Sequence, residues 1–178
     1  QDFSIYKNLS LVCFDENLWV GNGLTIPSGP LRESLSALKR AHFVIINGKK
    51  NLNIENKISN INKNIKIFYT KHNPLNIKEF KDKKVIAFAG IGNPKNFFNL
   101  LKSNKISIKE EISFSDHHKY SKIELNNLIN KDKGQDVILL TTEKDYFRID
   151  ESYKKYIKCL KIETEIENRM QFIEELKK

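Results

Sequence analysis

Short apolar runs alternate with segments in which apolar residues recur at helical spacing. The runs predict buried strands at residues 9–14, 43–46, 65–69, 85–89, 137–140 and within 156–162. The periodic segments predict helices at residues 33–41 and 54–61, after Pro94, after Ser121 and at the C-terminal end of the chain. Strands that alternate with helices predict an α/β layered fold with a largely parallel sheet.

Several local signals refine these elements. Residues 106–114 alternate between apolar and polar side chains, which is typical of a half-buried strand. Ser121 and Glu124 have the spacing of a capping box at a helix start. Thr164 and Glu167 have the same spacing, so we expect them to cap a final amphipathic helix.

A polar stretch at residues 70–83, which contains Pro74, separates two series of elements. Boundaries between lobes commonly fall in such polar segments. We therefore expect a first lobe at residues 1–75 and a second, smaller α/β lobe at residues 76–178.

Composition limits the classes of protein to consider. The 178 residues include 39% apolar and 30% charged residues, enough clustered apolar side chains for a core. No apolar run reaches 18 residues, so we expect no transmembrane helix. No signal-peptide pattern is visible, since the first residues are polar and acidic. The chain starts with Gln1 rather than Met, which suggests a fragment. Cys13 and Cys159 are far apart, and we interpret them as isolated thiols.

The net charge of +9 would attract nucleic acid, anionic lipid or phosphorylated ligands. Many lysines are scattered through Asn-rich loops and exposed helix faces. No motif of a nucleic-acid-binding protein is present in the sequence. We therefore favour a charge that keeps the protein soluble, and we expect no nucleic-acid partner.

A stiff loop precedes the first predicted helix. Two prolines and a glycine in IPSGPLRE deliver Arg32 and Glu33 to the helix start. Arginine is well shaped for bidentate phosphate contact, and glutamate oxygens can hold Mg²⁺ directly or through water. A surface arginine and a glutamate that is stabilised by the helix dipole would explain the pair as well.

The segment FSDHH follows a predicted strand, where active-site loops of α/β folds commonly lie. Asp116 can orient or charge-stabilise a histidine, and histidine titrates near neutrality. On an extended chain Asp116 and His118 would share a side, with His117 facing the other way. The alternative is two loop histidines without a role.

Two further segments also follow predicted strands. The glycine turn GIGNP at residues 90–94 precedes a helix start, so it is a potential anion site or simply a tight connection. In TTEKD, Thr142 and Asp145 form a capping pattern, whereas Lys144 could contact a phosphate.

The joint order of these segments is more specific than any one of them. GPLRE with SALKRA, then AFAGIGNP with FF, FSDHH and LLTTEKD, resembles the C-terminal half to two-thirds of tetraacyldisaccharide 4'-kinases. Gln1, the strand that ends in Asp15 and the turn at residues 21–23 resemble the stretch after the family's Asp-Asp-Gly-x-Gln motif. The resemblance covers nearly the whole chain and is weakest at residues 49–83 and beyond residue 150.

This resemblance implies a P-loop-NTPase-related α/β kinase that uses Mg²⁺ and moves the ATP γ-phosphate onto the 4' hydroxyl of a tetraacyldisaccharide 1-phosphate, a lipid A precursor. Residues 1–75 would be the remainder of the nucleotide- and metal-binding lobe. The enzyme would act peripherally, at the membrane surface on the cytoplasmic face of the bacterial inner membrane.

The resemblance also implies roles for single residues. Arg32, Glu33 and Gln1 would bind nucleotide, with Glu33 as a metal ligand. His117 would assist a catalytic base, which is an upstream carboxylate, and Asp116 would support His117. The family's Walker A loop and paired aspartates lie upstream of Gln1, so we expect the chain alone to be inactive.

Two other functions stay open from the sequence. A non-catalytic phosphate- or nucleotide-binding module built on residues 90–94 would bind ATP by itself. A basic nucleic-acid-binding protein would show binding that weakens steeply with salt.

Overall fold

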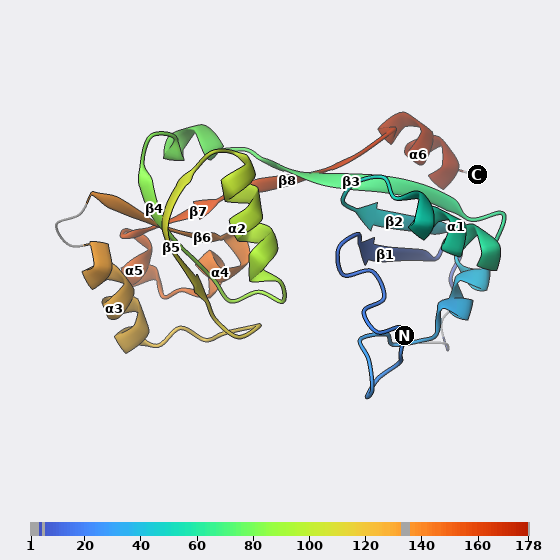
Figure 1. Cartoon of the computed structure of the whole chain (residues 1–178), viewed down its shortest axis with the longest axis horizontal. Coiled ribbons are helices and arrows are strands. Elements are labelled where there is room, and N and C mark those ends of the chain that lie inside the picture. Colours follow the sequence, from blue (N-terminus) through green and yellow to red (C-terminus); the bar gives the residue numbers. More distant parts are fainter. Residues whose placement is uncertain (1–3, 5, 133–135, 178) are drawn as a thin grey trace. The chain divides into compact units, whose positions relative to one another are not determined.

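The structure, a computed structural model, describes residue 4, residues 6–132 and residues 136–177, so Gln1 lies outside the described residues. The chain divides into two compact units (Figure 1). Unit 1 comprises Gln1–His72 and Thr164–Lys178, and unit 2 comprises Asn73–Glu163. This division differs from the expected one at residues 1–75 and 76–178, because the C-terminal segment returns to unit 1.

Unit 1 contains a four-stranded sheet in the order β1-β2-β3-β8. Strand β1 pairs with β2 and β2 with β3, both in parallel. The elements of unit 1 are β1 (Leu11–Asp15), the 3-10 helix η1 (Leu35–Arg40), β2 (Phe43–Asn47), α1 (Leu52–Ile61), β3 (Lys66–Pro74), β8 (Ile162–Ile166) and α6 (Arg169–Leu176).

Helices cover both faces of this sheet. On one face, η1 and α1 pack Leu38, Ile54 and Ile58 against the sheet in a single buried cluster. On the other face, Phe172 of α6 packs in a T-shaped contact with Phe68. Buried apolar area of this kind supplies most of the stability of such a unit.

The helix expected at residues 33–41 is a short 3-10 helix, η1. The Ser34 hydroxyl lies 2.6 Å from the Ser36 hydroxyl and makes no capping hydrogen bond to the backbone. Leu35 and Leu38 both pack against the unit 1 core. Their spacing of three residues places them on one face of a 3-10 helix.

The expectation that Thr164 caps the final helix is wrong. Thr164 lies within strand β8, and helix α6 begins after Asn168. Hydrogen bonds join the Glu167 N–H to Tyr69 O and the Leu75 N–H to Lys161 O, each at 2.9 Å. From Tyr69 to Leu75 the residue numbers rise in the direction of β3, while those of the bonded partners fall from Glu167 to Lys161, so β8 runs antiparallel to β3. Pairing with an open sheet edge outweighs the local capping pattern.

Unit 2 contains a second four-stranded sheet, in the order β5-β4-β6-β7, in which all pairs are parallel. The elements of unit 2 are η2 (Ile77–Phe80), β4 (Lys84–Ala89), α2 (Pro94–Ser103), β5 (Ser107–Ser113), α3 (Lys122–Asp132), β6 (Val137–Thr142), α4 (Glu143–Arg148), α5 (Glu151–Lys154) and β7 (Ile157–Leu160). The predicted α/β fold with parallel sheets is confirmed.

Two apolar clusters lie on opposite faces of the unit 2 sheet. Phe98 and Leu101 of α2 pack with Val85 on one face. Leu125 of α3 packs with Phe88 on the other face. The central strand β4 is buried on both sides, as expected of a parallel strand between helical layers.

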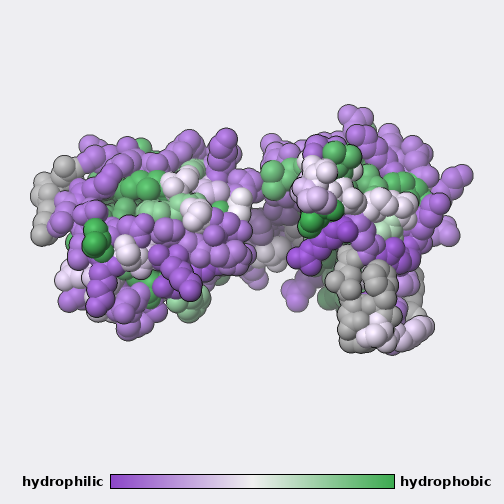
Figure 2. Space-filling view, turned by 90° about the horizontal axis from the view of Figure 1, so that it is seen from below, coloured by the Kyte–Doolittle hydropathy of each residue, from purple (hydrophilic) through white to green (hydrophobic). Residues whose placement is uncertain are grey.

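No helix within residues 6–132 and 136–177 is long and apolar enough to cross a membrane. On the face shown in Figure 2, hydrophilic residues predominate on both units, and hydrophobic residues form separate patches among them.

Candidate functional site

Two loops and the start of a helix meet at the carboxyl ends of the parallel strands in unit 2. Gly90 follows β4, the loop at residues 114–118 follows β5, and α4 follows β6. Strands β5 and β6 both pair with β4, so these segments lie side by side at one edge of the sheet. This edge is where ligands commonly bind in open α/β sheets.

A buried carboxylate connects these segments. Asp145 is fully buried, and its Oδ2 accepts hydrogen bonds from the Gly90 N–H at 3.0 Å and the Thr142 hydroxyl at 2.8 Å. Its Oδ1 lies 3.4 Å from Arg148 Nη1. The Asp145 N–H in turn donates to Thr142 Oγ1 at 3.2 Å, so the predicted capping pattern is confirmed. Lys144 of the same segment is exposed.

His117 lies on the loop after β5, next to the hydrogen-bonded groups around Asp145. Its backbone adopts a left-handed conformation with φ of 58°, and its N–H donates to Gly90 O at 3.1 Å. The loop is a turn rather than an extended chain, so the expected alternation of side chains is wrong. Asp116 Oδ1 accepts from the His117 N–H at 2.9 Å, and Asp116 Oδ2 lies 3.8 Å from His117 Nε2.

The two adjacent histidines have different environments. The His117 side chain is 80% exposed, whereas that of His118 is 21% exposed. His118 stacks on Phe114 with ring centroids 4.7 Å apart, and its Nε2 lies 3.0 Å from Glu124 Oε1. His118 therefore anchors the loop to the start of α3, and His117 remains open to a ligand.

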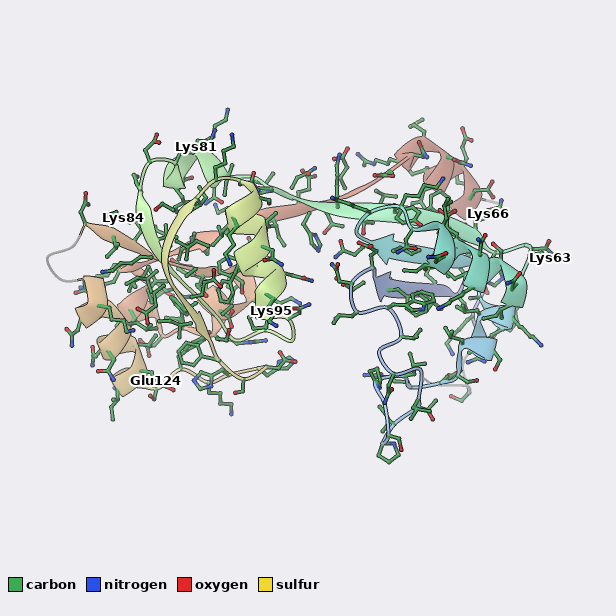
Figure 3. All side chains as sticks on the ribbon, viewed as in Figure 1. Lys63, Lys66, Lys81, Lys84, Lys95 and Glu124 are labelled. Carbon is green, nitrogen blue, oxygen red and sulfur yellow. The ribbon has the colours of Figure 1, made fainter. Side chains whose placement is uncertain are left out.

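The start of α3 is a capping box, as predicted. Glu124, labelled in Figure 3, accepts from the Ser121 N–H at 2.8 Å, and the Glu124 N–H donates to Ser121 Oγ at 3.2 Å. The hydrogen bonds that the Ser121 N–H and the Ser121 hydroxyl donate to Glu124 Oε2, the latter at 2.7 Å, lower the pKa of Glu124 below its usual value, with a smaller contribution from His118. The carboxylate that holds His118 is thus kept ionised.

Tyr120 packs against Phe114 and His118 of the loop after β5. Its ring packs edge-on against Phe88 and Phe114. Burial raises the pKa of Tyr120 well above its usual value, and the negative charge of Asp145 adds to the shift. The hydroxyl therefore stays protonated beside that carboxylate.

Gly90 and Gly92 should respond differently to alanine. A Cβ on Gly90 would lie 2.9 Å from His118 Cβ and 3.2 Å from Ser115 O, whereas one on Gly92 would first meet Asp116 Oδ2 at 3.3 Å. The exposed Asp116 side chain can move, but the packed loop cannot. We expect Gly90→Ala to lower the free energy of unfolding of unit 2 by about 1–3 kcal/mol, and Gly92→Ala by less than about 0.5 kcal/mol. Urea unfolding checks this, and equal losses would contradict it.

In unit 1, Arg32 and Glu33 line a pocket of about 740 Å³ together with Asp15, Trp19 and Arg40. Arg32 is exposed. Glu33 forms an ion pair with Arg40, and its other oxygen, Oε1, is buried without a hydrogen-bond partner in the described part of the chain. The structure therefore brings Arg32 and Glu33 to one pocket, in a unit separate from His117.

The Glu33 carboxylate can supply one oxygen to a cation, because Oε1 lacks a partner. Mg²⁺ in proteins usually keeps several waters and takes one or two carboxylates. Within the described residues, no group of three His, Cys, Asp or Glu side chains is arranged to hold a metal ion. Glu33 thus fits as a single ligand and does not form a complete site.

Sequence reasoning missed one member of the unit 2 network. Arg148 donates from Nη1 to Gly90 O at 3.1 Å, and its Nη2 lies 3.1 Å from His117 Nδ1. The only local signal is its position three residues after Asp145 on α4. The contacts to Gly90 and His117 join distant parts of the sequence, which spacing cannot reveal.

The known proteins that this chain resembles carry the names tetraacyldisaccharide 4'-kinase or LpxK. A tetraacyldisaccharide 4'-kinase of Pelagibacter ubique is 42% identical over 93% of this chain, and one of Rickettsia akari is 33% identical over 92%. The matches cover 54% and 49% of these relatives, so the chain spans about half their length. The crystal structure of LpxK from Aquifex aeolicus in complex with ATP aligns with 97% of this chain and 52% of its own, at a TM-score of 0.63 and 21% identity, which shows a shared fold.

The family model described as LpxK, tetraacyldisaccharide-1-P 4'-kinase, matches residues 1–178. The match includes both the pocket of Arg32 and Glu33 and the loop of Asp116 and His117. The chain therefore belongs to the tetraacyldisaccharide-1-P 4'-kinase family.

Proposed function

We propose that this chain is the C-terminal part of an enzyme that transfers the γ-phosphate of ATP to the 4' hydroxyl of a tetraacyldisaccharide 1-phosphate, a lipid A precursor. The observation that carries the proposal is the Asp116–His117 pair at the carboxyl end of a parallel sheet, in a chain of this family. ATP and Mg²⁺, when bound, supply the phosphoryl group and neutralise its charge.

In this proposal His117 acts on the sugar hydroxyl through a carboxylate outside the present chain. Its exposed imidazole can reach a partner, while its backbone is fixed to Gly90. Asp116 supports the ring from the Nε2 side. A histidine hydrogen-bonded to a carboxylate orients that base and tunes its proton affinity.

The proposed roles in unit 1 concern the nucleotide. The exposed Arg32 guanidinium is suited to phosphate oxygens, and Glu33 Oε1 to a cation or its water. Gln1 would belong to the same site. The remaining ligands of Mg²⁺ would come from residues outside this chain.

We also propose that the enzyme meets its lipid substrate peripherally, at the cytoplasmic face of the inner membrane. The net charge of +9 favours approach to a surface of anionic lipid.

The chain alone should lack kinase activity, whereas the protein encoded by the complete reading frame should phosphorylate the precursor. The measurement is transfer of labelled phosphate from ATP, with Mg²⁺, to tetraacyldisaccharide 1-phosphate. Transfer by the 178-residue chain at the rate of the complete protein would contradict the proposal that residues outside this chain supply the catalytic base and further Mg²⁺ ligands. Absence of transfer by the complete protein would overturn the proposed function.

The phosphate-binding module built on residues 90–94 is disfavoured by the site. The Gly90 N–H, the first donor of this turn, already binds Asp145. The Asp116 carboxylate also lies next to Gly92 and would repel an anion. Calorimetric detection of ATP binding to the chain alone that is lost in a Gly92→Asp variant would restore this alternative, whereas binding retained in the variant would place an ATP site elsewhere on the chain.

A nucleic-acid-binding surface gains no support from the lysines labelled in Figure 3. Lys63 and Lys66 of unit 1 lie on a loop and on β3, and Lys81, Lys84 and Lys95 of unit 2 lie on three further segments. A dedicated surface gathers such charges on one face or along one helix.

A further inference from the structure

Arg148 is tied to the loop network by three polar partners. Its Nη1 lies 3.1 Å from Gly90 O and 3.4 Å from Asp145 Oδ1, and its Nη2 lies 3.1 Å from His117 Nδ1. The Arg148 side chain is 27% exposed. A planar guanidinium can make these contacts together because its donors are arranged as a rigid fork.

The groups that contact the Arg148 guanidinium, Asp145 and Gly90, are themselves fixed in place. Asp145 is fully buried and holds both the Gly90 N–H and the Thr142 hydroxyl. Gly90 O receives two donors, the His117 N–H and Arg148 Nη1. The backbone of His117 and the head group of Arg148 are thus fixed to the same carbonyl, which sets their relative position.

The chemistry of the two side chains determines where the imidazole proton lies. Arginine has only donors, so the nitrogen that faces it, His117 Nδ1, must accept. A neutral imidazole that accepts at Nδ1 carries its proton on Nε2. Nε2 is the nitrogen on the side of Asp116 Oδ2, at 3.8 Å.

We propose that Arg148 is a positioning residue that holds His117 as the neutral tautomer with its proton on Nε2. His117 then presents its Nε2–H as a hydrogen-bond donor to the carboxylate outside this chain that acts as the base in the proposed function. It is not a free proton acceptor, because Arg148 occupies its other nitrogen. The functional part of this inference rests on the proposed kinase activity, whereas the tautomer itself does not.

The exposure of His117 explains why such a partner is needed. With 80% of its side chain exposed, the ring lacks packing that would select one rotamer or tautomer. His118, in contrast, is held by Phe114 and Glu124. Arg148 supplies for His117 the constraint that packing supplies for His118.

The first test is the nitrogen NMR spectrum of the histidine side chains in the 178-residue chain, about two pH units above the ordinary histidine pKa of about 6.5. His42 is an internal reference, because its Nδ1 accepts the Ser10 N–H at 3.1 Å and is therefore unprotonated. We expect His117 to match this pattern, with Nδ1 unprotonated and Nε2 protonated. A protonated Nδ1 on His117 would overturn the proposal.

Arg148→Ala should release the ring, so that the two nitrogen shifts of His117 move toward each other as the tautomers interconvert. Arg148→Lys retains a positive charge beside Asp145, but one ammonium group cannot reproduce the fork, so we expect the same release in a folded protein. Arg169→Ala, at an exposed arginine of α6, is the matched control and should change nothing. Unchanged His117 shifts in both Arg148 variants would also overturn the proposal.

The functional arm is a double-mutant cycle in the complete protein. Arg148→Ala should lower kcat by about 10- to 100-fold with KM for ATP nearly unchanged, as expected when a catalytic group is misplaced. In a His117→Ala background the same change should have no further effect on kcat. Additive losses would show that Arg148 does not act through His117, even if the NMR result holds.

Discussion

Asp145→Ala is expected to lower the free energy of unfolding of unit 2 by about 3 kcal/mol. The change removes a fully buried carboxylate and leaves the Gly90 N–H without its acceptor. It also deprives Arg148 of its anionic partner. Asp145→Asn, which keeps an acceptor for Gly90 but loses the charge, should cost clearly less.

The chain carries its own control for this measurement. Its single tryptophan, Trp19, lies in unit 1, so Trp19 fluorescence reports the unfolding of unit 1. Hydrogen exchange of the β4 amides reports unit 2. We expect faster exchange in β4 with an unchanged fluorescence transition. If Asp145→Ala left β4 exchange at the wild-type level, the buried network would not stabilise unit 2.

His117→Ala in the complete protein is expected to lower kcat by about 100-fold or more, with little change in ATP affinity. His117 is mostly exposed, so its loss should leave the unfolding free energy nearly unchanged. Steady-state kinetics with the lipid precursor, together with equilibrium ATP binding, separate the two effects. A raised KM for ATP with normal kcat would assign His117 to binding.

His118→Ala is the matched comparison on the neighbouring residue. It removes the stacking on Phe114 and the contact with Glu124, so its main effect should be on the stability of unit 2. A kinetic loss equal to that of His117→Ala, in a folded protein, would mean that the two histidines are not distinguished as the structure indicates.

Elements with strong local signals could be predicted from the sequence. The alternation at residues 106–114 corresponds to β5, whose side chains alternate between exposed and half-buried positions. The pairs Ser121–Glu124 and Thr142–Asp145 form the hydrogen bonds that their spacing indicates. Each of these signals depends on residues close in sequence, where the backbone geometry alone brings the groups together.

The errors arise where distant contacts decide. Thr164 has a capping partner three residues away, but β8 instead pairs with β3, far upstream in the sequence. Asp145 could be recognised as a local cap, but not as the acceptor for Gly90. Arg148 resembled any surface arginine, because its contact to His117 exists only after β4, β5 and β6 assemble.

Unit 2 is an insertion in unit 1, since the chain leaves unit 1 after His72 and re-enters it at Thr164. These two residues are hydrogen-bonded side chain to side chain at 3.0 Å, on the antiparallel strands β3 and β8. The entrance and exit of the insertion are therefore neighbours, as in domains that tolerate transplantation. Residues 73–163 could therefore be replaced in unit 1 by a tight hairpin turn that joins β3 to β8. The same residues could also be inserted, as a unit, into a surface loop of another protein.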